Sequence, residues 1–179
     1  MNMVPYVHSN YERKENDDYQ TIDPRCVDAL VQSIPLCDYI TDICASHGSG
    51  ILARLKDHGF SGLRGMTDAF GPYAGGNWIV TNPPYDRKIV DSFVLHALDL
   101  IKKKQAYGAC FLMRANWDLA SSRARLFDNP LYYGQVRMRF RPWWSEERKA
   151  QPIHNYVWHV WNSSHKREGG PRIVYWPKA

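Results

Sequence analysis

Two adjacent prolines, Pro83 and Pro84, separate an apolar run from a segment with helical spacing. Proline donates no backbone hydrogen bond and has a fixed φ angle, so this pair cannot belong to a central strand. The run at 77–81 therefore predicts a buried strand that ends in a rigid corner and is followed by a helix. An amide, Asn82, stands before the prolines and an aromatic ring, Tyr85, follows them, which makes the corner the first candidate for a functional site.

Strands and helices alternate along most of the chain, and this pattern predicts an α/β fold. Neighbouring segments with period-two alternation near the C-terminus add an antiparallel hairpin to one edge of a parallel sheet. The expected helices are 24–34, 50–59, 86–104 with Asp86 as its cap, and 116–130. The expected strands are 38–43, 60–68, 77–81, 106–114, 133–142, 154–162 and 171–176.

Two loops follow predicted strands directly, at 42–50 and 82–85. In open α/β sheets ligands bind beyond the carboxyl ends of the strands, so we expect both loops to face the same side. The first loop begins with an acid and continues with small residues onto a helix N-terminus, which permits close approach by a ligand. An ordinary turn explains it equally well. Its glycine spacing matches neither a dinucleotide fingerprint nor a P-loop.

The second loop has a more specific chemistry. The side-chain carbonyl of Asn82, the backbone carbonyl of Pro83 and the ring of Tyr85 are all fixed in direction, and Pro84 keeps the corner rigid. An amino group attached to a flat ring needs such a set, because two acceptors hold its two N–H groups while an aromatic face stacks on the ring. The alternative is a turn that only ends a strand.

The composition sets broader limits. The 179 residues suit one domain with a real core, and the net charge of +5 is compatible with a polyanionic partner without requiring one. Four scattered cysteines predict neither a disulfide framework nor a zinc site. Residues 1–18 read as a polar arm and 19–179 as a single domain. No secretory signal or membrane-spanning run is recognisable, so we expect a cytoplasmic location.

Three segments together resemble a known family. "NPPY" resembles the catalytic motif of amino-group S-adenosylmethionine-dependent methyltransferases, "DICASHGSG" is similar to their methionine-binding loop, and "DDYQTIDPRCVDALV" is similar to their N-terminal cofactor segment. The order of the motifs resembles that of DNA N6-adenine methyltransferases, most closely the short phage- and prophage-borne kind. The resemblance covers about residues 18–177.

The resemblance implies a Rossmann-like methyltransferase fold, S-adenosyl-L-methionine as cofactor, and double-stranded DNA with a flipped adenine as partner. For a phage protein the location would be the host cytoplasm. The implied cofactor contacts are Tyr19, Thr21, Asp42, Cys44, Ala45, Ser46, Gly48 and Asp68, and the implied catalytic residues are Asn82, Pro83, Pro84 and Tyr85.

The chain also departs from the family pattern. Only about 30 residues separate the glycine loop from NPPY, a span that usually holds two more strands and a helix. Asp68 is the one well-placed acid there, and its role is open between the ribose and the cofactor adenine. Methylation of RNA or of a protein glutamine is an alternative, as is a non-catalytic module that binds nucleic acid or a partner.

No separate recognition domain fits in a chain of this length, so the contacts to DNA would come from loops at about 116–130 and 141–155. Trp143 and Trp144 could form a stacking platform, although packing is the commoner role of such residues. Candidate phosphate contacts, each with a solvated polar face as its alternative, are Arg123, Arg125, Arg137, Arg139, Arg141, Arg148 and Lys149.

Overall fold

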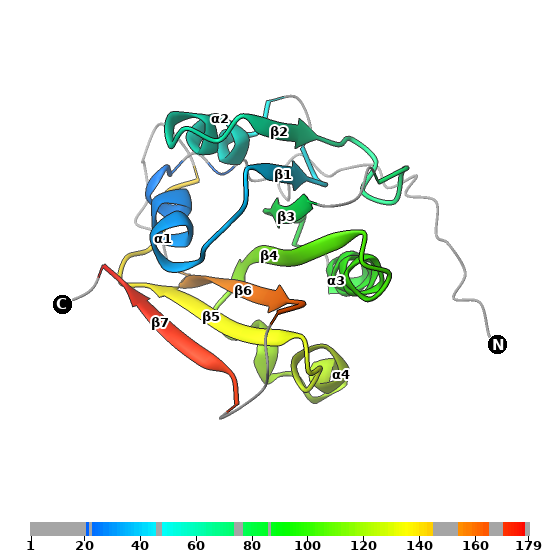
Figure 1. Cartoon of the computed structure of the whole chain (residues 1–179). Coiled ribbons are helices and arrows are strands. Elements are labelled where there is room, and N and C mark those ends of the chain that lie inside the picture. Colours follow the sequence, from blue (N-terminus) through cyan, green and yellow to red (C-terminus); the bar gives the residue numbers. More distant parts are fainter. Residues whose placement is uncertain are drawn as a thin grey trace.

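The computed structural model describes residues 21, 23–45, 48–73, 77–85, 87–144, 154–164 and 170–177. The predicted N-terminal arm, Tyr19, Ser46 and the cap Asp86 lie outside the described residues. One seven-stranded sheet forms the centre of the molecule, in the order β2-β1-β3-β4-β6-β5-β7 (Figure 1). The strands are β1 Tyr39–Asp42, β2 Gly62–Gly65, β3 Asn77–Thr81, β4 Ala106–Arg114, β5 Tyr132–Met138, β6 Tyr156–Asn162 and β7 Arg172–Trp176.

The sheet is mostly parallel, with an antiparallel C-terminal part. Strands β2, β1, β3 and β4 are parallel neighbours, whereas β6 runs antiparallel to both β4 and β5. The edge strand β7 pairs with β5 in parallel. The predicted α/β class is therefore confirmed. The order of the strands could not be predicted from period-two alternation: β6 lies between β4 and β5.

Helices cover both faces of the sheet. Figure 1 shows α1 and α2 on one side and α3 and α4 on the other. The helices are α1 Arg25–Ser33, α2 Gly50–Asp57, α3 Arg87–Lys102 and α4 Ala124–Phe127, with 3-10 turns η1 Trp117–Leu119 and η2 Ser121–Arg123. None of the helices in the described part of the chain is long and apolar enough to cross a membrane.

The expected helix at 116–130 is the one element predicted wrongly. The structure has two 3-10 turns there, separated by Ala120, whose backbone is extended, and a single turn of α-helix that directly follows the second of them. Asn, Asp and Ser disfavour continuous helix because their side chains compete for backbone hydrogen bonds. Asp118 instead accepts a bond at 2.7 Å from the Gln135 amide on β5. Tertiary contacts therefore override the apolar spacing.

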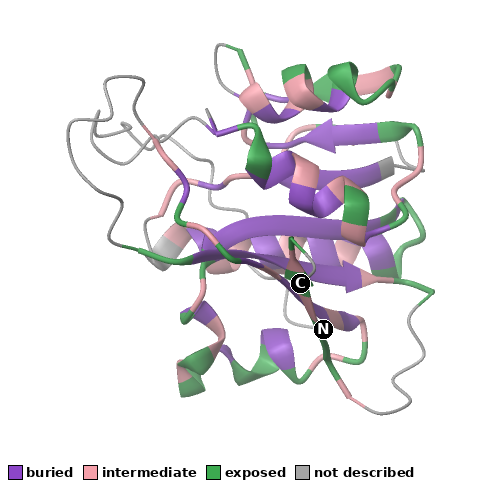
Figure 2. Ribbon diagram, turned by 90° about the vertical axis from the view of Figure 1, so that its left-hand side faces the viewer, coloured by how far each residue is buried: buried purple, intermediate pink, exposed green. Residues whose placement is uncertain are grey.

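Strand β6 contributes side chains to the core on both faces of the sheet. All but its last residue are buried, so both of its faces pack against helices (Figure 2). The indole of Trp158 donates to the Cys26 carbonyl of α1 at 2.7 Å, and that of Trp161 donates to the Leu126 carbonyl of α4 at 2.9 Å. Because side chains alternate along a strand, these two rings anchor opposite layers to the sheet. Both tryptophans are fully buried in the core.

Candidate functional site

The carboxyl ends of β1 and β3 meet at the point where the chain changes direction in the sheet. From β1 the chain moves outward to β2, then returns past β1 to β3 and continues to β4. Such a switch point is where ligands bind in open α/β sheets. The Thr81 hydroxyl at the end of β3 donates to the Asp42 carboxylate at the end of β1, at 2.6 Å. The two predicted loops therefore face the same side, as expected.

Asp42 organises the first loop from within. Its buried carboxylate also accepts the Ser49 hydroxyl at 2.6 Å and the Cys44 backbone N–H at 3.1 Å. The Ser49 oxygen in turn accepts the Leu52 N–H at 3.1 Å and so caps α2. One carboxylate thus fixes the end of β1, the end of β3 and the start of α2. A direct contact between Asp42 and a cofactor stays a prediction.

Two residues of the predicted cofactor segments have features that a bound ligand would explain. Thr21 is 5% exposed, and its hydroxyl has no hydrogen-bond partner within the described ranges. A buried hydroxyl without a partner is costly, so such an atom marks a place where a partner is expected. Gly48 has a φ of +89°, and a Cβ added there would meet nothing within 4 Å. Together with Ala45 and Cys44 on the same loop, these residues fit the methionyl part of the implied cofactor.

Asp68 lies three residues beyond the carboxyl end of β2. The adjoining segment is held to β1 by the Met66 N–H, which donates to the Asp42 backbone carbonyl at 2.8 Å. The Asp68 side chain is exposed and accepts the Phe70 N–H at 3.0 Å, which closes a local turn. Asp68 therefore lies at the same end of the sheet as the two loops, and its contact with a ribose or with the cofactor adenine stays a prediction.

The NPPY corner folds back on itself. The Tyr85 hydroxyl donates to the Asn82 side-chain carbonyl and lies 3.4 Å from the Leu112 carbonyl of β4. Pro83 is buried, whereas Asn82 and Tyr85 are only partly covered. The bond from Tyr85 fixes the rotation of the Asn82 amide and so the direction in which its carbonyl oxygen points.

An aromatic wall stands beside this corner. It consists of Tyr85, Trp144 and Tyr156, with ring centroids 4.7 Å apart for Trp144 and Tyr156, 5.4 Å for Tyr85 and Tyr156, and 6.4 Å for Tyr85 and Trp144. Sequence reasoning identified Trp144 only as one of two candidates for packing or stacking, and missed the link to Tyr85. The signal available was the aromatic residue at the start of the alternating segment 154–162.

The predicted phosphate contacts fall into different environments. Arg123 is buried, donates to Asp91 of α3 at 2.8 Å and covers the Trp117 ring at 3.8 Å. It therefore fastens the η1–η2 segment to α3 and does not face a nucleic acid. Arg139 and Arg141 are exposed just beyond β5. The Arg139 guanidinium lies over the Tyr175 ring of β7 at 5.3 Å, and the Arg141 side chain donates to the Asn155 side chain, next to Tyr156, at 3.1 Å. Arg148 and Lys149 lie outside the described residues.

This assignment predicts a difference between two neighbouring arginines. Arg123→Ala leaves the partly buried Asp91 without its ion pair and removes the cover of Trp117, so we expect a loss of about 2 kcal/mol in the free energy of unfolding. Arg125→Ala removes an exposed side chain and should change stability by less than about 0.5 kcal/mol. Urea unfolding of the two variants measures both values. Equal losses would contradict the assignment of Arg123.

Other ionisable groups of the core are unsuited to nucleophilic or acid–base roles. Burial raises the pKa of the Cys26 and Cys110 thiols and lowers the pKa of His159 to about 3. These groups are therefore neutral at physiological pH. Across the described ranges, no group of three His, Cys, Asp or Glu side chains is placed to hold a metal ion.

Comparisons with known proteins give a distant structural likeness. No protein-family model matches the chain, and no curated protein sequence matches it. Among solved structures, a modification subunit assigned to a type I restriction enzyme from Vibrio vulnificus YJ016 is similar, with a TM-score of 0.48 and 16% identity. The match covers 90% of this chain and 47% of that one, so the chain spans about half the length of the neighbour. A likeness this distant transfers no activity.

Proposed function

We propose that this chain is an S-adenosylmethionine-dependent methyltransferase that modifies the exocyclic N6 amino group of adenine in DNA. The observation that carries the proposal is the position of Asn82-Pro83-Pro84-Tyr85. The motif leaves the sheet at the carboxyl end of β3, beside the loop that Asp42 braces at the end of β1. An amino-group acceptor and a cofactor loop are thus neighbours at the switch point.

The acceptor roles follow from the corner geometry. The Asn82 oxygen, with its amide rotation set by Tyr85, accepts one N–H of the target amino group, and the Pro83 carbonyl accepts the other. These two bonds draw electron density onto nitrogen and align it for attack. No strong base is required, because the amino proton becomes acidic only as the new bond forms. The buried cysteines and His159 are neutral, so they offer no strong base, and the proposed reaction needs none.

The aromatic wall supplies the stacking surface. An adenine can reach the corner only after it leaves the double helix, and unstacking costs a few kcal/mol. Tyr85 and Trp144 offer ring faces that replace the lost base stacking. The exposed Arg139 and Arg141, which follow β5 toward Trp144, supply positive charge for the phosphate backbone. This combination of stacking and charge favours a nucleic acid over a protein glutamine.

When bound, S-adenosylmethionine supplies an electrophilic methyl group. Thr21 and the loop from Cys44 to Gly48 would hold its methionyl part, with the orphaned Thr21 hydroxyl as a hydrogen-bonding group. Gly48 permits close approach, because its positive φ is available to glycine without strain. Asp42 acts here through the loop that it shapes.

The proposal is tested by methyl transfer from labelled S-adenosylmethionine. Unmethylated double-stranded DNA, RNA and a protein mixture are offered in parallel, and the labelled product is digested to identify the modified base or residue. We expect N6-methyladenine from DNA. Label in RNA or in glutamine would show that the substrate is not DNA, while the methyltransferase activity would stand. No transfer to any of the three substrates would reject the proposed activity.

A conservative change at Thr21 provides an independent prediction. S-adenosylhomocysteine at about 100 times its Kd should raise the Tm by roughly 5–10 °C, since it binds only the folded state. Thr21→Val removes the orphaned hydroxyl at nearly constant volume. We expect the unliganded variant to be as stable as the wild type or more stable by about 1 kcal/mol, because a buried unsatisfied group is lost.

The ligand-induced shift in Tm should be clearly smaller in Thr21→Val, because the hydroxyl no longer contacts the ligand. Differential scanning fluorimetry measures both quantities. A wild type that shows no shift would favour the non-catalytic binding module. A ligand-induced shift in Tm as large in Thr21→Val as in the wild type would show that Thr21 does not contact the ligand.

A further inference from the structure

Asp23 connects two parts of the chain that lie far apart in sequence. It precedes α1, two residues after Thr21, and its carboxyl is 5% exposed. One carboxylate oxygen accepts the backbone N–H of Trp143 at 3.2 Å, a contact across 120 residues. The segment that carries the aromatic wall is thereby bonded to the start of α1.

Arg25 completes this connection. Its guanidinium donates to both Asp23 oxygens, at 2.9 and 2.7 Å, and lies over the Phe140 ring at 4.2 Å. Burial of the Asp23 carboxyl opposes ionisation, but the hydrogen bonds from Arg25 and from the Trp143 amide outweigh it and hold its pKa below its usual range. A charged acceptor gives a stronger hydrogen bond than a neutral one, so the Trp143 amide is firmly held.

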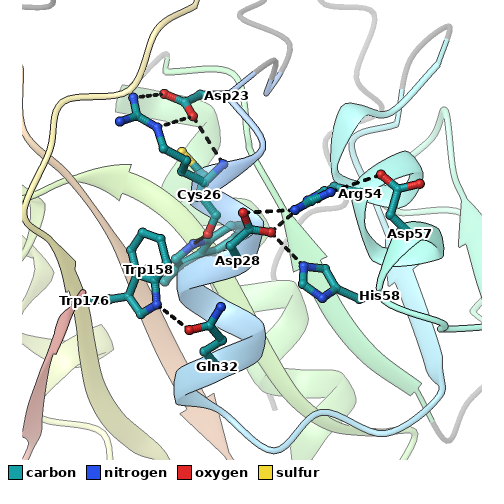
Figure 3. A network of polar contacts seen from close by, with 10 residues as sticks. Asp23, Cys26, Asp28, Gln32, Arg54, Asp57, His58, Trp158 and Trp176 are labelled. Atoms are coloured by element: carbon teal, nitrogen blue, oxygen red, sulfur yellow. Dashed lines mark hydrogen bonds and ion pairs between the residues drawn. The ribbon is translucent and has the colours of Figure 1, made fainter. Parts of the chain in front are cut away.

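The same segment is supported from a third side. The Phe140 ring meets the Trp176 ring edge to face at 5.9 Å, and the Trp176 indole donates to the Gln32 side chain of α1 at 2.9 Å. Figure 3 shows Asp23 at the start of α1 and Gln32 near its end. Segment 140–143 is thus attached to α1 at both ends of the helix, and Trp144 follows immediately.

The two neighbours of Asp23 belong to different halves of the proposed site. On its N-terminal side is Thr21, whose buried hydroxyl has no partner in the described part of the chain. Across the hydrogen bond is Trp143, and the next residue, Trp144, packs against Tyr85 of the NPPY corner. The Asp23 carboxylate therefore lies on a short path from Thr21 to Trp144.

We propose that Asp23 is a positioning residue that couples the cofactor side of the site to the aromatic wall of Tyr85, Trp144 and Tyr156. The inference rests on the proposed function, because Thr21 faces a cofactor only if that function holds. A ligand bound beside Thr21 restrains the backbone on the N-terminal side of Asp23. The bond from the Trp143 amide to Asp23 extends this restraint to residues 143 and 144, so that the stacking surface is held more rigidly when the cofactor is bound.

A purely structural role for Asp23, as the cap of α1, gives a different expectation. Its carboxylate does accept the Arg25 N–H at 3.2 Å, so its loss lowers stability in either case. Beyond the general stabilisation that any bound ligand gives, only the coupling makes the Trp143 amide respond to a ligand bound at Thr21. Hydrogen exchange of that single amide, followed by NMR, therefore separates the two roles.

The experiment compares Asp23→Ala with Asp28→Ala. Asp28 also lies on α1 and is also ion-paired, but its partners are Arg54 and His58 on the side of α2, as Figure 3 shows. Without ligand, we expect the Trp143 amide to exchange at least about tenfold faster in Asp23→Ala than in the wild type. The Cys110 amide in the central strand β4 reports any global loss of stability, and Asp28→Ala should leave the Trp143 amide at the wild-type rate relative to it.

With saturating S-adenosylhomocysteine, exchange at Trp143 should slow further in the wild type and in Asp28→Ala. In Asp23→Ala the ligand should still raise the Tm, but the additional slowing at Trp143 should be absent. Equal slowing in Asp23→Ala would overturn the coupling. Asp23→Asn keeps an acceptor oxygen and should restore part of the effect, so it replaces the alanine variant if that one does not fold.

Failure of this inference and failure of the proposed function give different results. A wild type that does not bind S-adenosylhomocysteine rejects the function and the coupling together. A wild type that binds the ligand without any change at Trp143 rejects the coupling alone. The comparison without ligand decides in every case whether Asp23 holds the Trp143 amide.

Discussion

Asn82→Ala should lower the rate of methyl transfer by about 100- to 1,000-fold, the range seen when one preorganised hydrogen-bonding group at a reaction centre is removed. The side-chain carbonyl is the acceptor that the corner presents with a fixed orientation, since the Tyr85 hydroxyl is bonded to it. Alanine removes this acceptor and also frees the Tyr85 hydroxyl. The target amino group then loses one of its two acceptors, and the Tyr85 ring loses one of the contacts that hold it.

The cost of Asn82→Ala to folding should be modest, because Asn82 is only partly buried and follows β3. We expect a change in the free energy of unfolding of about 1 kcal/mol. The KM for S-adenosylmethionine should remain near the wild-type value, because the amide contacts the base. The effect therefore falls on kcat, and steady-state assays with DNA measure the two parameters separately.

Asn162→Ala is the matched control. Asn162 also accepts a hydrogen bond through its side-chain oxygen, from the Ser164 N–H at 2.8 Å. Asn162 is the last residue of β6, which runs antiparallel to β4. It therefore lies at the amino ends of the parallel strands, whereas NPPY lies at their carboxyl ends. Its replacement should leave the rate within about twofold of the wild type. Near-normal methylation by Asn82→Ala would reject the assignment of NPPY as the catalytic corner.

Local sequence patterns were sufficient to predict most elements of the sheet. Each expected strand is present within a few residues of its predicted bounds, because apolar alternation and the Gly and Pro breaks act over short distances. The placement of the two loops at one edge also followed, since it depends only on parallel strands. The helix at 116–130 failed because Asp118 and Arg123 make tertiary contacts that a local pattern does not contain.

The connections within the site were not predictable in the same way. Thr81 and Asp42 are 39 residues apart, and Asp23 and Trp143 are 120 apart. Each pair forms because the sheet order brings separate segments together, and the position of β6 between β4 and β5 is itself a tertiary outcome. A polar β-branched residue at the end of an apolar strand, such as Thr81, was the available signal for a buried hydrogen bond at that point.

Gly134→Ala should be the most destabilising small substitution in the sheet. Gly134 lies in β5 with a φ of +140°, a region that residues with a side chain rarely adopt. A Cβ there would lie 1.9 Å from the Arg172 carbonyl oxygen and 2.6 Å from its nitrogen on β7. Both atoms belong to the backbone, so a side-chain rotation cannot relieve the clash. We expect a loss of about 3 kcal/mol or more in the free energy of unfolding, with β7 displaced from β5.

Gly170→Ala separates the two causes of that loss. Gly170 also has a positive φ, +83°, but an added Cβ would meet nothing within 4 Å, so only the conformational cost of about 1 kcal/mol applies. In urea unfolding, the free energy of unfolding of Gly134→Ala should therefore be well below that of Gly170→Ala. Equal free energies would mean that β5 and β7 are not in close contact.

The displacement of β7 also affects the site, because β7 carries Trp176, which packs against Phe140 in the segment leading to Trp144. Gly134→Ala should consequently speed hydrogen exchange at the Trp143 amide, whereas Gly170→Ala should not.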